Sequence, residues 1–350
     1  MSRLNDEKPY QRALLLSGGG TRLALYGGMF EALEKHGLKP DIFIASCGGA
    51  FASVVINTFA THDQRKAFFQ SKEYFNFVAH IQLTYHRKLH KLAWYAYKKT
   101  FDKRKAPIIE DIFETYLVEM SQDLSKQLPS LATTSFHQAS PTVMIGSKIL
   151  FSQEEVGQKR GQQKLFQKVL LTDETTAQKM DFNQQILKSQ NYQQSAVMED
   201  VAIKTTLSML QAARMSMADM FYMAPMKEKE ENFLGGVVDL VPIELGFSLA
   251  KNVILERKQG YTRIEEGLIR AVFGFSANAR LDEINQYQVK HWIDTRDASV
   301  ALRGFYPQKN INWKAFEVSL SLPSSYEKFQ EDIQKQWQYG YEKTLESIQR

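Results

Sequence analysis

Ser46 has the sequence surroundings of a catalytic nucleophile. It follows the predicted strand 41–45, which is apolar from Ile42 onward, and precedes two glycines, Gly48 and Gly49, which open a predicted helix. A serine at a sharp strand-to-helix turn has its hydroxyl lifted away from the sheet edge, beside a helix N-terminus that stabilises negative charge. The alternative is that the Ser46 hydroxyl only caps the helix, which is a common role for serine.

A run of three glycines could bind an anion. Gly18, Gly19 and Gly20 follow the apolar run 13–16 and precede Thr21 and Arg22. Successive backbone N–H groups in such a loop can face an anion at the start of a helix. A Walker loop would end in Gly-Lys-Ser/Thr, which is absent, and a dinucleotide loop would have a third glycine where this chain has Leu23. The remaining alternative is a tight strand-to-helix turn without a ligand.

A third segment, far along the chain, has the pattern of a strand that runs into a glycine turn. It contains Leu234, Gly235 and Gly236, and Asp239 follows shortly after the turn. In this order, the three segments resemble the patatin-like phospholipase family, closely over residues 12–60 and moderately over 203–247. That family has a glycine-rich oxyanion loop, a Gly-x-Ser-x-Gly nucleophile elbow and an Asp-Gly-Gly or Asp-Gly-Ala turn.

The resemblance implies a role for each segment and also shows one departure in each. Ser46 would be the nucleophile, and the oxyanion hole would be formed by Gly18, Gly19, Gly20, Thr21 and Arg22. Leu23 and Ile44 stand where the family has glycine, and Leu234 occupies the position of the family's catalytic Asp. Leucine cannot accept a proton, and loss of a general base typically lowers the rate by about 10²–10⁴.

These departures leave two functions open. The first is a serine lipid acyl hydrolase of the phospholipase A, lipase or esterase type, which acts through a Ser46 acyl-enzyme and is weakened at Leu234. Asp239 is then the best substitute base, while Asp219 and Asp294 are further acids without a positional argument. The second is a catalytically inactive patatin-like protein that binds acyl lipid or a partner protein.

The elements that must position these residues predict an α/β fold. Short apolar runs that end in glycine turns, at 13–16 and 41–45, are typical of buried parallel strands, and helices are predicted at 22–36 and 48–58. Further strands are predicted at 141–151 and 165–171, and a Met-rich helix at 205–224. With the resemblance, this predicts a three-layer patatin-like fold with a mainly parallel central sheet, flanking helices and helical insertions.

We expect one patatin-like domain over 1–350, with its core at 12–60 and 203–300. A helical basic insertion is predicted at about 62–130, including an amphipathic helix over 108–124. A Gln-rich peripheral segment is predicted at about 152–200, where eleven Gln residues occur, and a C-terminal helix at about 326–348.

The basic insertion suggests an anionic partner. Between residues 86 and 105 there are eight Lys or Arg residues and one acid, Asp102, with Trp and Tyr interleaved. Cations with interfacial aromatics suit an anionic membrane surface; nucleic acid and a solvated helical face are the alternatives. The predicted membrane patch consists of Arg87, Lys88, Lys91, Trp94, Lys98 and Lys99.

Composition favours a cytoplasmic protein that can associate peripherally with membranes. The chain of 350 residues is 43% hydrophobic and carries a net charge of +5, and no apolar run approaches the ~20 residues of a membrane span. Its N-terminus lacks the apolar core of a signal peptide, and its single cysteine, Cys47, is typical of a reducing compartment. None of the seven histidines has metal-ligand spacing, so we expect neither a metal ion nor a cofactor.

Overall fold

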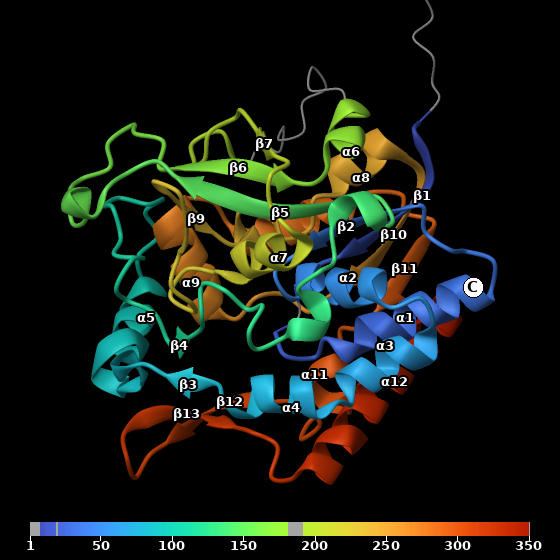
Figure 1. Ribbon diagram of the computed structural model, residues 1–350. Coiled ribbons are helices and arrows are strands. Elements are labelled where there is room, and N and C mark those ends of the chain that lie inside the picture. The colour runs from blue at the N-terminus through green and yellow to red at the C-terminus, as the bar shows by residue number, and fades with distance from the viewer. Residues whose placement is uncertain (1–7, 19, 181–191, 350) are drawn as a thin grey trace, which may run out of the picture.

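A mostly parallel sheet runs through the centre of the molecule in the computed structural model, which describes residues 8–18, 20–180 and 192–349 (Figure 1). Along the main row of strands in this sheet, neighbours are parallel, except for one antiparallel pair, β5 and β6. The order is β11 (His291–Asp294), β10 (Ala250–Arg257), β1 (Tyr10–Leu16), β2 (Ile42–Ser46), β5 (Thr142–Ile149), β6 (Phe166–Leu171) and β7 (Ala202–Lys204).

A short antiparallel branch brings the third motif to the same sheet. β9 (Glu231–Leu234) pairs with β5, and β8 (Met226–Glu228) pairs with β9. A 3₁₀ turn, Gly236–Asp239, follows β9. The two-glycine turn after β9 therefore lies beside the end of β2, although the two are far apart in sequence.

The central strands have buried apolar stretches, such as Ala13–Leu16 of β1 and Ile42–Ala45 of β2, because helices cover both faces of the sheet. Leu14 and Leu16 of β1 join one apolar cluster, while Ala13 and Leu15 join the other. The first cluster includes α1 (Ala24–Lys35), α2 (Gly48–Thr58), α7 (Met209–Met217) and α12 (Tyr326–Ile348), and the second includes α8 (Ile243–Leu249), α9 (Arg263–Phe273) and α10 (Ala277–Ile284). This is the predicted three-layer α/β fold.

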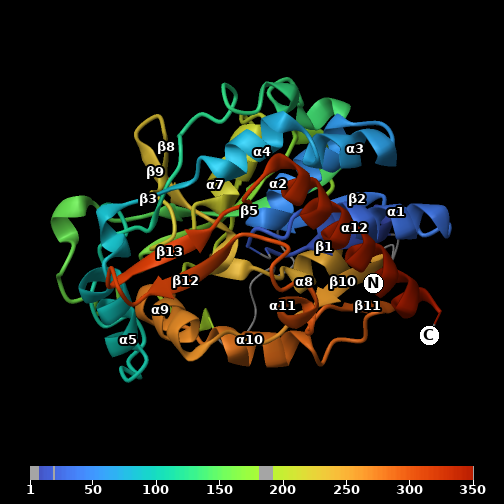
Figure 2. The ribbon, with the colours of Figure 1, turned by 90° about the horizontal axis from the view of Figure 1, so that it is seen from below.

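The helix α12 spans the range predicted for a C-terminal helix and packs against α1 (Figure 2). The two helices approach closely at glycines. A Cβ atom at Gly28 would collide with the carbonyl oxygen of Trp337, and one at Gly340 would collide with that of Leu25. The Trp337 indole N–H also donates to Glu31, 2.5 Å away.

The basic insertion is less helical than we predicted. It has two short helices, α3 (His62–Phe69) and α4 (Lys72–Ala79), a 3₁₀ turn at Tyr85–Arg87, a π-helical turn at Leu89–Ala93, and α5 (Trp94–Lys99). A small ladder pairs β3 (Gln82–Leu83) with β4 (Val118–Glu119).

The amphipathic helix predicted over 108–124 is not formed. Asp111 accepts hydrogen bonds from the backbone N–H groups of Phe113 and Glu114 and from the Thr115 hydroxyl. A short acidic side chain that binds neighbouring backbone groups competes with helical hydrogen bonding. The apolar residues here instead reach the core from an irregular chain, as the full burial of Ile109 and Ile112 shows.

The Gln-rich segment is not wholly peripheral, because it contributes β6 to the sheet. Leu170 and Leu171 are fully buried there, and α6 (Glu174–Gln178) follows. Residues 181–191 of this segment lie outside the described residues.

A hairpin of β12 (Gln308–Asn312) and β13 (Glu317–Ser321) stands apart from the main sheet (Figure 1). Within the described ranges, no helix has both the length and the apolar character that a membrane span requires.

Candidate active site

The sharp turn between β2 and α2 is made by Cys47. Ser46 is the last residue of β2, and α2 begins at Gly48. Cys47 between them has φ 50° and ψ −124°, which is a strained conformation for a residue other than glycine. A strained strand-to-helix turn of this kind presents a nucleophile at the top of the sheet. The residue in the elbow position is therefore Cys47.

Ser46 does not present its hydroxyl as predicted. It is fully buried, pairs with Ile145 of β5, and its Oγ donates to the carbonyl oxygen of Asp239 at 3.4 Å. The strand extends one residue further than predicted, so the alternation of side chains turns Ser46 into the interior. Cys47, one residue later, is partly exposed.

The sequence allows either Ser46 or Cys47 to occupy the elbow position, because one glycine lies two residues after Ser46 and another lies two residues after Cys47. The structure distinguishes them at Gly49, where a Cβ atom would collide with the carbonyl oxygen of Leu16. The close approach that the elbow requires is thus made two residues after Cys47. The small residue two positions before the nucleophile is then Ala45, and Ile44 is an ordinary buried strand residue rather than a departure from the motif.

Asp219 is the acidic residue that lies beside the glycine turn. It comes just after α7, near enough to the Cys47 thiol for each group to affect the pKa of the other. The two-glycine turn makes room for it, because a Cβ atom at Gly235 would collide with Asp219 Oδ1. A carboxyl group therefore reaches the elbow from a neighbouring loop and not from the turn after β9.

The two groups of this dyad influence each other's protonation. Burial raises the pKa of Asp219 to about 7, against smaller lowering effects of hydrogen bonds from the Cys47 thiol and the Val237 N–H and of the Lys309 charge. Burial, and then the Asp219 charge, raise the pKa of the Cys47 thiol well above its ordinary value, while the Gly48 N–H and Lys258 act in the opposite direction. The resting pair is therefore a neutral thiol beside a carboxyl group that can accept its proton near neutral pH.

Leu234 and the second glycine of the turn have packing roles. Leu234 is fully buried within the apolar cluster that includes Ile145 and Val238. A Cβ atom at Gly236 would lie 2.9 Å from Cβ of Ser46 and 3.2 Å from the backbone nitrogen of Cys47. The glycine turn after β9 thus packs directly against the elbow.

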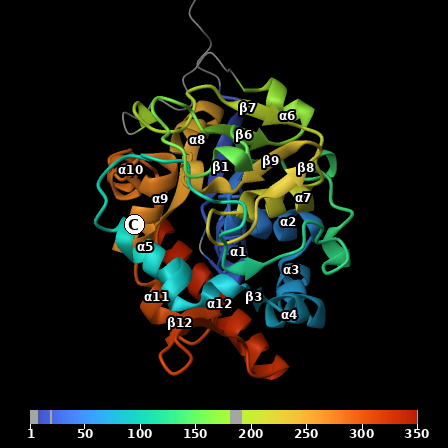
Figure 3. The same ribbon diagram turned by 90° about the vertical axis from the view of Figure 1, so that its left-hand side faces the viewer.

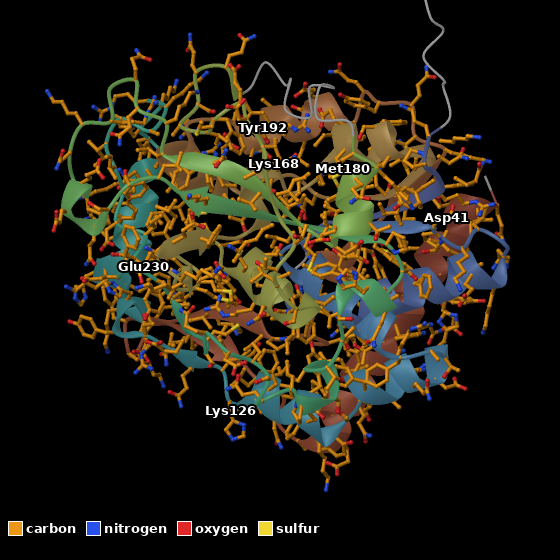
Figure 4. The ribbon with its side chains drawn as sticks, turned by 45° about the horizontal axis from the view of Figure 1, so that its top comes forward. Asp41, Lys126, Lys168, Met180, Tyr192 and Glu230 are labelled. Carbon is orange, nitrogen blue, oxygen red and sulfur yellow. The ribbon has the colours of Figure 1, made fainter. Side chains whose placement is uncertain are left out.

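Asp239, the predicted substitute base, is committed to a buried ion pair. Its Oδ2 pairs with the ammonium group of Lys168, and both side chains are fully buried. Its Oδ1 lies 3.6 Å from Nη2 of Arg280, and Arg280 also pairs with Glu244. The Tyr192 hydroxyl donates to the carbonyl oxygen of Val238 at 2.8 Å (Figure 4 labels Lys168 and Tyr192). Asp239 therefore fixes the turn after β9 and is not available as a base for either elbow residue.

The glycine loop lies across the thiol. A Cβ atom at Gly18 would be 2.6 Å from Cβ and 3.1 Å from Sγ of Cys47, and Gly20 has a positive φ of 65°. Gly19 lies outside the described residues. The carbonyl oxygen of Ser17 accepts hydrogen bonds from the Tyr26 hydroxyl and from Lys258 Nζ. These two side chains therefore fix the start of the loop.

The remaining loop residues face the hairpin of β12 and β13. The Thr21 hydroxyl donates to the carbonyl oxygen of Pro307 at 2.8 Å, and the Arg22 guanidinium lies over the Tyr306 ring, 5.2 Å from its centroid. The backbone N–H of Cys47 donates to Ser216 Oγ at 2.9 Å. The backbone N–H of Cys47 is therefore not available to an oxyanion at this site.

A small cavity of about 20 Å³ is lined in part by Tyr192, Val237, Leu240, Tyr261 and Arg280, and neither Cys47 nor Asp219 is among its lining residues. This space is sufficient for about one water molecule. No group of three or more His, Cys, Asp or Glu side chains placed to hold a metal ion occurs among the residues that the structure describes.

Two of these residues were not assigned from the sequence. From the sequence, we placed the nucleophile at Ser46, one residue before Cys47. However, Ala45, two positions before Cys47, is closer to the glycine of the family pattern than Ile44, two positions before Ser46. Asp219 had a signal of its own, because it is the only charged residue between Arg214 and Lys227. A single acid within a buried Met- and Ala-rich segment requires a reason for its burial.

A family model described as patatin-like phospholipase matches residues 14–246, which is well over half of the chain. Among solved structures, the crystal structure of VipD from Legionella pneumophila is similar, with 11% identity and a TM-score of 0.35, over 99% of this chain and 69% of that chain. No curated protein matches the chain by sequence. On the family match, the chain belongs to the patatin-like phospholipase family.

Proposed function

We propose that the protein is a lipid acyl hydrolase in which Cys47 is the nucleophile and Asp219 is the general base. The observation that carries the proposal is the Cys47 thiol at the strained elbow, packed against Gly18 of the glycine loop, with the Asp219 carboxyl group in the space beside Gly235. Membership of the family supports a lipid ester as the substrate class. The proposal replaces Ser46 and Asp239 in the roles for which the sequence suggested them.

The first half-reaction transfers the acyl group to sulfur. Asp219 accepts the thiol proton as Sγ attacks the ester carbonyl, and the negative charge that develops on the carbonyl oxygen faces the N–H groups of the glycine loop. The C–O bond of the ester then breaks, and Asp219 returns the proton to the leaving alcohol. The product on the enzyme is a thioester at Cys47.

The second half-reaction uses water. Asp219 accepts a proton from a water molecule that attacks the thioester carbonyl, and the same loop faces the oxyanion again. The C–S bond breaks, the fatty acid is released, and Asp219 returns the proton to sulfur.

Trapping of the acyl-enzyme tests the proposal. The protein is incubated with a p-nitrophenyl ester of a medium-chain fatty acid, quenched in acid and mapped by peptide mass spectrometry. We expect the acyl group on Cys47 and its removal by neutral hydroxylamine, which cleaves thioesters much faster than oxygen esters. An adduct on Ser46 that resists hydroxylamine would contradict the assignment of the nucleophile.

The same experiment addresses the catalytically inactive alternative. The absence of any adduct and of any p-nitrophenol release from the purified protein, with the unmodified thiol still reactive toward iodoacetamide, would favour an acyl-lipid or partner-binding protein over an enzyme. A thioester adduct that turns over excludes that alternative.

A further inference from the structure

The most exposed large hydrophobic side chains are concentrated on one part of the molecule. Nine such side chains are found in the described residues, and two of them, Ile264 and Val300, lie elsewhere. The other seven occur on the segment 85–101 and on the hairpin of β12 and β13, and Trp313 at the hairpin tip is 72% exposed. We call these seven the apolar surface: Tyr85, Trp94, Tyr97, Phe101, Ile311, Trp313 and Phe316.

The two segments form a single surface. The backbone N–H of Leu89 donates to the carbonyl oxygen of Phe316 at 3.1 Å, and Lys88 and Glu317 form an isolated β-bridge. Trp94 and Tyr97 stack with ring centroids 5.7 Å apart, and Tyr97 packs edge-on against Phe101. Figures 2 and 3 show the hairpin beside α5, on the side of the molecule that faces the viewer in Figure 3.

The charge on this surface is strongly positive. Residues 85–105 and 306–321 together contain ten Lys or Arg residues and only two acids, Asp102 and Glu317. Both acids are already neutralised, Asp102 by Arg104 at 2.9 Å, and Glu317 by Arg87 and Lys88. Excess cations therefore surround the exposed aromatic rings.

The distribution of charge differs from the membrane patch that the sequence predicts. Arg87, Lys88 and Lys99 are each bound to a carboxylate, Lys99 to Glu110 at 2.6 Å. Lys91 and Lys98 lie over the Tyr85 and Trp94 rings instead. The hairpin adds Lys314, which is exposed between Trp313 and Phe316.

The base of the hairpin touches the candidate active site. Pro307 and Tyr306 contact Thr21 and Arg22 of the glycine loop. Lys309 lies 4.9 Å from the ring of Tyr222, and its charge acts on Asp219. The hairpin therefore connects the apolar surface to the glycine loop.

We propose that the apolar surface docks on a bilayer that contains anionic phospholipid, with Trp313 and Phe316 inserted among the headgroups. Aromatic side chains surrounded by lysines suit the boundary between headgroups and acyl chains, and each cation close to an anionic surface adds to the attraction. Nucleic acid would use the charge but not seven exposed apolar side chains. Docking is independent of turnover, and only the delivery of lipid to Cys47 rests on the proposed function.

Vesicle binding by the full chain tests the docking. Binding to vesicles of phosphatidylcholine and phosphatidylserine is measured by co-sedimentation and by quenching of Trp fluorescence with brominated lipid. We expect Trp313→Ala with Phe316→Ala to weaken binding about 10–100-fold, and Lys98→Glu with Lys314→Glu to weaken it about 10-fold or more. Val300→Ala, at an equally exposed apolar residue outside the surface, is the matched control and should bind as wild type does.

Further readouts separate docking from chemistry and from other partners. Cys47→Ala should bind vesicles as wild type does, and Trp313→Phe should keep binding but lose most of the quenching.

Equal binding of the tip variant and of Val300→Ala overturns the docking proposal, even if the enzyme hydrolyses soluble esters. Tighter binding to an oligonucleotide than to vesicles, with no dependence on Trp313, overturns it as well. Docking without hydrolysis of any ester leaves this inference standing and removes the proposed function.

Discussion

The elbow after β2 and the glycine turn after β9 pack against each other, but they have kept different parts of the chemistry. The elbow keeps its strained backbone and its close glycine contact at Gly49, while sulfur stands where the family has a serine oxygen. The turn keeps both glycines, but Leu234 stands where the family has its catalytic Asp. The space beside Gly235 is filled by Asp219 from the loop after α7. On the assignment that we propose, a carboxyl group keeps its place beside the elbow although its place in the sequence has changed.

The difference between the two acids nearest the elbow shows how environment selects the base. Asp239 is closer in sequence to the family's Asp, but Lys168 and Arg280 hold its charge in a buried pair. Asp219 has no ion pair in the described part of the chain, and burial raises its pKa to about 7. A carboxyl group without a counter-charge is the better proton acceptor near neutral pH.

The largest expected effect distinguishes the two candidate nucleophiles. Cys47→Ala should lower kcat for ester hydrolysis by about 10⁴–10⁶, as loss of a nucleophile does in other acyl-transfer enzymes. Ser46→Ala removes only one buried hydrogen bond to a carbonyl oxygen and should change kcat less than tenfold. Steady-state rates of folded, purified variants decide this, and the reverse order of the two effects would return the role to Ser46.

Loss of the base should have the next largest effect. Asp219→Asn keeps the shape of the side chain but cannot accept a proton, so kcat should fall by about 10²–10⁴. Asp219→Glu is the matched variant, because it retains the carboxyl group and should recover part of the rate. If Asp219→Asn were as active as wild type, the Cys47–Asp219 pair could not be the catalytic dyad.

The sequence predicted the fold and the region of the candidate site more accurately than it predicted which side chains form that site. Runs of apolar residues ending in glycine define β1, β2 and the turn after β9, because buried parallel strands leave a simple signature. The elbow turn lies one residue later than the sequence suggested, at Cys47 instead of Ser46, because glycine follows both residues at the required spacing and only the end of β2 decides between them. Asp219 could not be assigned, because its role depends on a tertiary contact between the loop after α7 and Gly235.

Asp239→Asn should affect stability more than chemistry. The change leaves the Lys168 ammonium group buried without a charge partner, which typically costs about 3–5 kcal/mol of unfolding free energy. The rate per folded molecule should stay within about tenfold of wild type. Urea unfolding measures the stability, and the ester-hydrolysis rate divided by the folded fraction from circular dichroism gives the rate per folded molecule. A stable protein with a rate reduced as far as in Asp219→Asn would instead make Asp239 the base.

Leu234→Asp reverses the departure from the family pattern, yet we expect it to restore nothing. The new carboxyl group would lie in an apolar cluster with Ile145 and Val238, at a cost of roughly 2–4 kcal/mol in stability. Asp219 already fills the space next to the thiol, so kcat should not rise. An increase in kcat of tenfold or more would show that the turn after β9 can still supply the base.

The charge of Asp219 should also appear in the pH dependence of stability. Because the folded protein raises the pKa of this group, it binds the Asp219 proton more tightly than the unfolded chain does. The contribution of Asp219 to the unfolding free energy therefore falls as pH rises from about 4 to about 7, by at most about 4 kcal/mol. Asp219→Asn removes this penalty, so it should be more stable than wild type at pH 8 and similar at pH 4. Urea titrations at the two pH values measure the difference, and a variant less stable than wild type at pH 8 would exclude the raised pKa.

The smallest effect concerns the pH profile of kcat/KM, which reports the free enzyme. A thiol–carboxyl pair is active when the carboxyl group is ionised and the thiol still holds its proton, so kcat/KM should rise about tenfold per pH unit up to about pH 7 and then level off. The raised pKa of the thiol places any further change well above neutral pH. Asp219→Asn should abolish the acidic limb, whereas Asp239→Asn should leave it in place. A bell-shaped profile centred near neutral pH in wild type would instead indicate a thiolate–imidazolium pair, and with it a base other than Asp219.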